Sequence, residues 1–119
     1  MNRIGRYLSA ADALLFHLKD DPLFRITILL KTQAYLAAGN PVSMAVRGDA
    51  AASVNSAHSG VVCEPERPAS IARAVGLRAS SSAEQLMMLG QAGKEFYLRE
   101  HSLAAGVDPF KQTFAAAIN

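Results

Sequence analysis

The sequence predicts one α/β domain of three layers, in which helices cover both faces of a parallel sheet of about three strands. Short apolar runs of strand length, at residues 13–18, 41–46 and 60–65, alternate with segments of helical character. Strands separated by helices need crossover connections, and these produce parallel sheets. The 119 residues, half of them apolar, suffice for one compact domain but not for two.

The composition also limits the class of partner. Twelve basic and ten acidic residues leave a formal charge of +2, without a basic run. Nucleic-acid binding therefore has little support. The N-terminal segment lacks the long apolar stretch of a signal peptide, and no window reaches the roughly 18 apolar residues that a membrane span needs. We expect a soluble, cytoplasmic domain with no nucleic-acid partner and no membrane span.

The first elements follow from periodicity and turn residues. Residues 4–11 carry apolar side chains at i, i+3, i+4 and i+7, which indicates a helix. The run at 13–18 alternates poorly, as a parallel strand covered on both faces does. The polar segment 19–27 contains Pro22 and is predicted to be a loop. A helix over 30–38 then ends at Gly39, which suits the left-handed position after a helix.

The middle of the chain repeats this alternation. Residues 41–46 form the second predicted strand, and Asp49 can cap a helix over 50–57 by accepting from the amides of its first turn. The run "GVVCEP" at 60–65 is the third strand. Pro68 suits the first turn of a helix over 69–77.

Two further helices complete the chain. Ser81 and Glu84 have the spacing of a capping box before a helix over 83–100. A final helix, from 107 or 108 to 117, is expected to bury Phe110 and Phe114. The helix over 83–100 is expected to pack through an apolar stripe of Leu86, Met87, Phe96 and Leu98.

The single cysteine excludes a disulfide framework and a thiolate metal cluster. Its apolar neighbours predict that Cys63 is a small buried side chain rather than a nucleophile. His17, near the end of the first strand, is either a hydrogen-bonded structural histidine or a ligand contact. His58 and His101 lie at predicted helix ends, where a protonated ring complements the helix dipole, and neither is assigned to chemistry.

Ligands of open parallel sheets bind beyond the carboxyl ends of the strands, where this chain has loops at 19–30, 46–49 and 64–67. Arg25 and Lys31 flank the start of a helix, whose free amides favour phosphate, so the pair suits a diphosphate. The alternative is a solvated polar loop. Asp20 and Asp21 lack a third ligand, and no metal site is predicted.

Four segments, "ADALLFHLKDDPLFRIT", "KTQAYLAAGNPVSMAVRGDAA", "SGVVCEPERPASIARAV" and "GKEFYLREHS", occur in order along the chain. Together they resemble the C-terminal part of family 4 glycosyltransferases of the GT-B architecture. The likeness is greatest to bacterial surface-polysaccharide enzymes of the fucosamine or colanic-acid type. The block from Lys31 to Pro41 is its most specific part.

The resemblance implies the C-terminal half of a Rossmann-like domain that binds a nucleotide-diphosphate sugar. Such an enzyme transfers the sugar to a lipid-linked or growing saccharide, at the inner face of the membrane and without a cofactor or metal. The resemblance implies diphosphate contacts from Arg25, Lys31 and Thr32. It also implies sugar or ribose contacts from Lys19, Asp21 and Gln33.

By the same resemblance, residues 1–119 are a partial donor domain without its N-terminal acceptor domain, and we expect the chain alone to be inactive. The final helices would pack towards that missing domain. Ile26 and Ala34 stand where many relatives carry two glutamates, so no catalytic residue is named. Relatives also read Pro-Ser where this chain has Leu29 and Leu30. The alternative is therefore a non-catalytic interaction module that pairs through an exposed sheet edge, with itself or with a partner chain.

Overall fold

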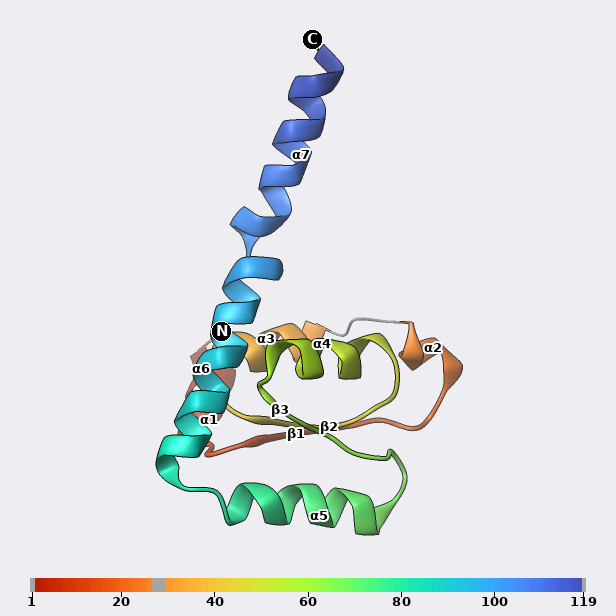
Figure 1. Ribbon diagram of the computed structural model, residues 1–119, viewed down its shortest axis with the longest axis vertical. Coiled ribbons are helices and arrows are strands. Elements are labelled where there is room, and N and C mark those ends of the chain that lie inside the picture. The colour runs from red at the N-terminus through yellow and green to blue at the C-terminus, as the bar shows by residue number, and fades with distance from the viewer. Residues whose placement is uncertain (1, 27–29, 119) are drawn as a thin grey trace.

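The computed structural model describes residues 2–26 and 30–118 and has a mixed α/β fold around a parallel sheet (Figure 1). Three strands, β1 (Leu14–His17), β2 (Val42–Ala45) and β3 (Gly60–Val62), lie in the order β1-β2-β3. Leu14 lies opposite Val42, and Val42 lies opposite Gly60. The predicted parallel sheet of three strands with flanking helices is confirmed.

Helices cover both faces of this sheet (Figure 1). On one face lie α3 (Leu30–Ala38) and α4 (Asp49–Ala57), and on the other lies α5 (Pro68–Ala79). The larger buried cluster belongs to the α3 and α4 face and consists of Phe16, Val42, Met44, Val46, Ala50, Ala51 and Val54. The cluster under α5 is smaller and consists of Ala45, Cys63 and Ala74. The core is therefore asymmetric.

β1 is covered on one face only, which corrects the prediction of a strand covered on both. Leu14 and Phe16 are buried, whereas Leu15 is 45% exposed and His17 is exposed. The central strand β2 is buried throughout. The difference arises because β1 lies at the edge of the sheet, while the buried contacts of α5 are with residues of β2 and of the segment after β3.

α1 (Asn2–Ala10) and α6 (Ala83–Glu100) complete the α3 side of the fold. α6 does not pack through the predicted apolar stripe, since Met87 and Leu98 are exposed. It packs through Gly90 and Gly93, which are its buried residues. A Cβ atom on Gly90 would lie 1.9 Å from the carbonyl oxygen of Gly39. The face with glycines is the only one that allows this close approach of two backbones.

α7 (Leu103–Ile118) extends away from the rest of the molecule (Figure 1), and none of its described residues is buried. Phe110 and Phe114 are 67% and 65% exposed, so the expectation that they are buried is wrong. The helix also begins earlier than predicted. The hydroxyl oxygen of Ser102 accepts from the Ala105 N–H at 3.2 Å, which satisfies an amide of the first turn.

Several helix starts and caps lie near, but not at, the residues predicted for them. The predicted loop over 19–27 contains α2 (Pro22–Arg25), because Asp21 caps it by accepting from the Leu23 N–H at 2.9 Å. Asp49 is the first residue of α4 rather than its cap, and Gly48 takes the cap position with φ 96°.

The capping box of α6 consists of Ser82 and Gln85, one residue beyond the predicted Ser81 and Glu84. Pro68 lies in the first turn of α5 as expected, but the helix begins one residue before the predicted range of 69–77 and ends two residues beyond it, at Ala79.

Candidate functional site

The carboxyl ends of the three strands bring together loops that are far apart in the sequence. β1 leads into Lys19 and α2, β2 leads into Arg47 and Gly48, and β3 leads into Glu64 and Glu66. This edge is where parallel sheets bind ligands. Side-chain contacts between the loops give the edge a defined structure.

Asp20 is the centre of these contacts. Its carboxylate accepts from Nε and Nη2 of Arg25 at 3.2 and 3.0 Å, and it forms an ion pair with Nε of Arg47 at 3.2 Å. Arg47 also forms a close ion pair with Glu64. We call Asp20, Arg25, Arg47 and Glu64 the carboxyl-edge cluster. Both arginines are about half exposed, so the cluster contributes little to stability in water.

A second set of hydrogen bonds ties β1 to the loop after β3. The Glu66 N–H donates to Nε2 of His17 at 3.0 Å, and the Asp20 N–H donates to Oε2 of Glu66 at 3.0 Å. Glu66 has φ 59°, a left-handed conformation that is uncommon for residues other than glycine. His17 is therefore a hydrogen-bonded structural histidine, which is one of the two roles that the sequence left open.

Close backbone packing holds Arg25 beside the exit of β2. A Cβ atom on Gly48 would lie 2.0 Å from the carbonyl oxygen of Arg25 and 2.4 Å from its Cα. Only glycine permits this contact, and the φ of 96° at Gly48 also favours glycine. The end of α2 is thereby held next to Arg47 and the start of α4.

The residues predicted to contact a donor fall into two groups. Lys19, Asp21 and Arg25 lie at the carboxyl edge with the cluster, although the Asp21 carboxylate is occupied in capping α2. Lys31 and its neighbours lie on α3. Figure 1 shows α2 beyond the carboxyl ends of the strands and α3 beginning over the face of the sheet. The first group therefore lies in and just before α2, and the second lies on α3.

The first turn of α3 has its own polar features. Thr32 is 1% exposed, and its Oγ1 has no hydrogen-bond partner within the described residues. A buried hydroxyl without a partner is uncommon and costs stability. Lys31 is exposed and forms no ion pair within residues 2–26 and 30–118, and Gln33 is half-buried. Leu29 lies outside the described residues.

Sequence reasoning identified the three loops but not the residues that join them. Arg47, Glu64 and Glu66 lie in those loops but were not assigned to a site, and Asp20 was considered only as a weak metal ligand. Each of these charged residues follows closely after a strand. In a parallel sheet that position is enough to predict that they meet at one edge.

The formal charges of the edge cancel. The loops and the start of α3 carry five basic residues and five acidic residues. The basic residues are Lys19, Arg25, Lys31, Arg47 and Arg67, and the acidic ones are Asp20, Asp21, Asp49, Glu64 and Glu66. Long-range attraction of a phosphate to this edge is therefore weak, and selectivity for an anion would depend on local geometry.

Cys63 lies just before Glu64 and is buried, as predicted. Burial raises the pKa of the Cys63 thiol, and the charge of Glu64 raises that pKa further. The thiol therefore stays protonated near neutral pH, which does not suit a nucleophile.

Within the described residues, no group of three or more His, Cys, Asp or Glu side chains is arranged to hold a metal ion. None of the helices in the described part of the chain combines the length and the apolar character needed to cross a membrane. In comparisons with known proteins, the chain matches no protein-family model, no curated protein and no solved structure.

Proposed function

We propose that the carboxyl edge binds the diphosphate of a nucleotide sugar, and that the chain is the donor-binding part of a surface-polysaccharide glycosyltransferase. The resemblance of the sequence motifs motivates this proposal. The observation that carries it is the meeting of two guanidinium groups, those of Arg25 and Arg47, over the single carboxylate of Asp20. Arginine pairs of this kind are well suited to phosphate oxygens.

The contacts of the cluster leave capacity for a ligand. Asp20 occupies Nε and Nη2 of Arg25, while Nη1 of Arg25 has no bond to any described residue. A diphosphate would compete with Asp20 for both arginines and with Glu64 for Arg47, and its several anionic oxygens can accept from both guanidinium groups at once. Lys31 would add a third cation, and Thr32 a hydroxyl donor, if the start of α3 approaches the ligand.

The reaction implied is transfer of the sugar from its diphosphate to a saccharide acceptor. Arg25 and Lys31 would stabilise the negative charge that develops on the departing diphosphate, which is usually a large contribution at such sites. The acceptor and a general base would have to come from outside this chain. We therefore expect donor binding but no turnover from these 119 residues alone.

Titration with UDP and with GDP, followed by backbone amide chemical shifts, tests donor binding. We expect saturable shifts at Arg25, Arg47 and the first turn of α3, and a loss of affinity of about tenfold in Arg25→Gln or Lys31→Gln. Lys111→Gln, on the exposed α7, is the matched control and should bind as the wild type does. A well-dispersed spectrum without saturable shifts, or equal affinity in all three variants, contradicts the proposal.

One observation favours a second candidate, an interaction module that pairs through the free edge of β1. Leu15 on β1 and Val75 on α5 are both about half exposed and border the same cavity of about 150 Å³. An apolar edge strand of this kind is a site for pairing with a second copy. Sedimentation should then show a dimer that Leu15→Lys dissociates and that Ala72→Lys, on an exposed position of α5, leaves intact. A monomeric wild type rules this candidate out.

A further inference from the structure

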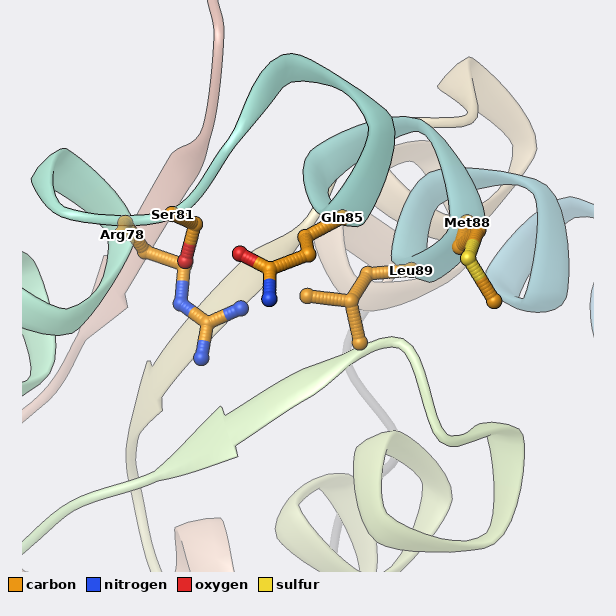
Figure 2. Close-up of a pocket in the computed structure, with 5 residues that line it drawn as sticks. All are labelled: Arg78, Ser81, Gln85, Met88 and Leu89. Carbon is orange, nitrogen blue, oxygen red and sulfur yellow. The ribbon is translucent and has the colours of Figure 1, made fainter.

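A cavity at the opposite, amino edge of the sheet is lined by an arginine, two of whose nitrogens have no hydrogen-bond partner in the described part of the chain. It has a volume of about 340 Å³, lies between the end of α5 and the first turns of α6, and is lined by Arg78, Ser81, Gln85, Met88 and Leu89 (Figure 2). Arg78 also borders a smaller cavity beside Leu14 at the start of β1. The position is therefore distinct from the carboxyl-edge cluster. We call it the Arg78 cavity.

The guanidinium of Arg78 is incompletely satisfied. Its Nε and Nη1 atoms are buried and have no hydrogen-bond partner within the described residues. An arginine near the end of a helix often bonds the last carbonyls of that helix. Here the Gly76 and Leu77 carbonyls accept from other groups instead, the Ser80 N–H at 3.0 Å and the Ser81 hydroxyl at 2.6 Å. Arg78 is partly buried, and two buried guanidinium nitrogens without an acceptor are costly, so an acceptor for them is favoured.

Gln85 presents a second donor to the same space. The side-chain Oε1 of Gln85 accepts from the Ser82 N–H at 2.9 Å, and the backbone N–H of Gln85 donates to the Ser82 hydroxyl at 3.1 Å. This capping box fixes the carboxamide oxygen and leaves the NH₂ group for the cavity. Figure 2 shows the side chain of Gln85 pointing towards that of Arg78, with Leu89 beside them. Two donors directed at one space can share an acceptor that lies between them.

The rest of the lining defines the class of ligand. Leu89 and Met88 provide an apolar wall next to the donors. The hydroxyl oxygen of Ser81 adds an acceptor, since its proton is used in the bond to Leu77. One cation and one amide suit a single negative charge, and the apolar wall suits a short hydrocarbon group. The volume lies at the lower end of the range for small-molecule sites.

We propose that the Arg78 cavity binds a small organic monocarboxylate with an apolar tail. The carboxylate lies between the guanidinium of Arg78 and the amide nitrogen of Gln85. The tail lies against Leu89 and Met88.

Titration of the full chain with 4-methylpentanoate, followed by amide chemical shifts, tests this site. We expect saturable shifts at Arg78, Ser81 and Gln85, with a dissociation constant on the order of 1 mM for so small a ligand. The neutral amide 4-methylpentanamide, which has the same tail, should bind at least about tenfold more weakly. Equal affinity for the acid and the amide overturns the proposal, as does the absence of saturable shifts.

Two variants on the same helix separate charge from folding. Arg78→Gln removes the charge but keeps much of the length, and we expect at least a tenfold loss of affinity. Arg73→Gln, at an exposed position five residues earlier on α5, is the matched control and should bind as the wild type does. Unchanged affinity in a folded Arg78→Gln overturns the proposal.

A third variant keeps the test valid if Arg78→Gln does not fold. Gln85→Glu preserves the acceptor of the capping box and brings a carboxylate to Arg78. We expect it to abolish binding of 4-methylpentanoate and to raise the midpoint of thermal unfolding. Retained binding in this variant overturns the proposal. Inorganic phosphate and chloride are titrated in parallel, and equal or tighter binding of either would mean that the cavity is not selective for a carboxylate with a tail.

Discussion

Replacement of Gly90 by alanine is expected to destabilise the fold by about 2–3 kcal/mol, although alanine is the better helix former. The perturbation is a single methyl group on the face of α6 that lies against the turn after α3. The added Cβ would lie 1.9 Å from the carbonyl oxygen of Gly39 and 2.7 Å from its carbonyl carbon. These are backbone atoms, so no side chain can rotate to relieve the contact.

The size of the effect follows from the displacement that α6 would need. A carbon atom ordinarily approaches a carbonyl oxygen to about 3.3 Å, so α6 must shift by more than 1 Å. That shift opens the packing over Leu36, which is fully buried. Overpacking of this kind costs about 3 kcal/mol or more, and the better helix propensity of alanine returns up to about 1 kcal/mol.

Urea unfolding followed by far-ultraviolet circular dichroism measures the change, and the other helical glycines are matched controls. A Cβ on Gly76 meets no atom within 4 Å, so Gly76→Ala should stabilise the protein by about 0.5–1 kcal/mol. A Cβ on Gly93 would lie 2.8 Å from Cβ of Ser59, a contact that a small shift can relieve, so Gly93→Ala should fall between the two. If Gly90→Ala is as stable as Gly76→Ala, the backbone contact between α6 and the turn after α3 is refuted.

Three further predictions concern caps, burial and pH. Ser82→Ala should cost about 1 kcal/mol of unfolding free energy in the same assay, because it removes the capping box of α6, and no loss would contradict that cap. Phe16→Ala should lower the free energy of unfolding by about 3–4 kcal/mol, because Phe16 is buried. The double variant Phe110→Ser with Phe114→Ser should change it by less than about 0.5 kcal/mol, because both side chains are exposed. Similar losses in the two variants would mean that α7 is packed in solution. Burial raises the pKa of the Cys63 thiol in the folded protein above its pKa of about 8.5 in the unfolded chain. The stability that depends on the protonated thiol is therefore complete below the pKa of the unfolded chain and is lost as the pH rises through the pKa of the folded protein. The unfolding free energy should therefore fall more steeply above about pH 9 in the wild type than in Cys63→Ala. If the free energies of the two proteins fall in parallel with pH, the raised pKa of Cys63 is contradicted.

Features that depend on local backbone chemistry could be predicted from the sequence. The limits of α6 and α3 match the structure because Gly39 takes the left-handed position, with φ 76°, and a serine cap precedes Ala83. Pro68 starts α5 as expected. The loops at the carboxyl edge were also predictable, since any chain of alternating strands and helices places them there.

The buried faces of the helices were less predictable. The sequence of α6 contains both an apolar stripe and two glycines, and periodicity favours the stripe. The glycines form the buried face because they let α6 approach Gly39 and Ser59, which are distant in sequence. Phe110 and Phe114 have the spacing of a buried face, yet among the described elements none covers this part of α7.

Amino-acid order alone was thus sufficient for the alternation of strands and helices, for the limits of α3 and α6, and for the expectation that Cys63 is buried. The alternation and these limits depend on interactions within a few residues of the chain, and the apolar neighbours of Cys63 mark it for the core. Only the tertiary structure shows the pairing of Arg47 with Asp20 and the hydrogen bond from Glu66 to His17. The same holds for the two buried nitrogens of Arg78 that lack a partner among the described residues. Such contacts join segments that the sheet brings together, and their geometry depends on how closely the helices approach it.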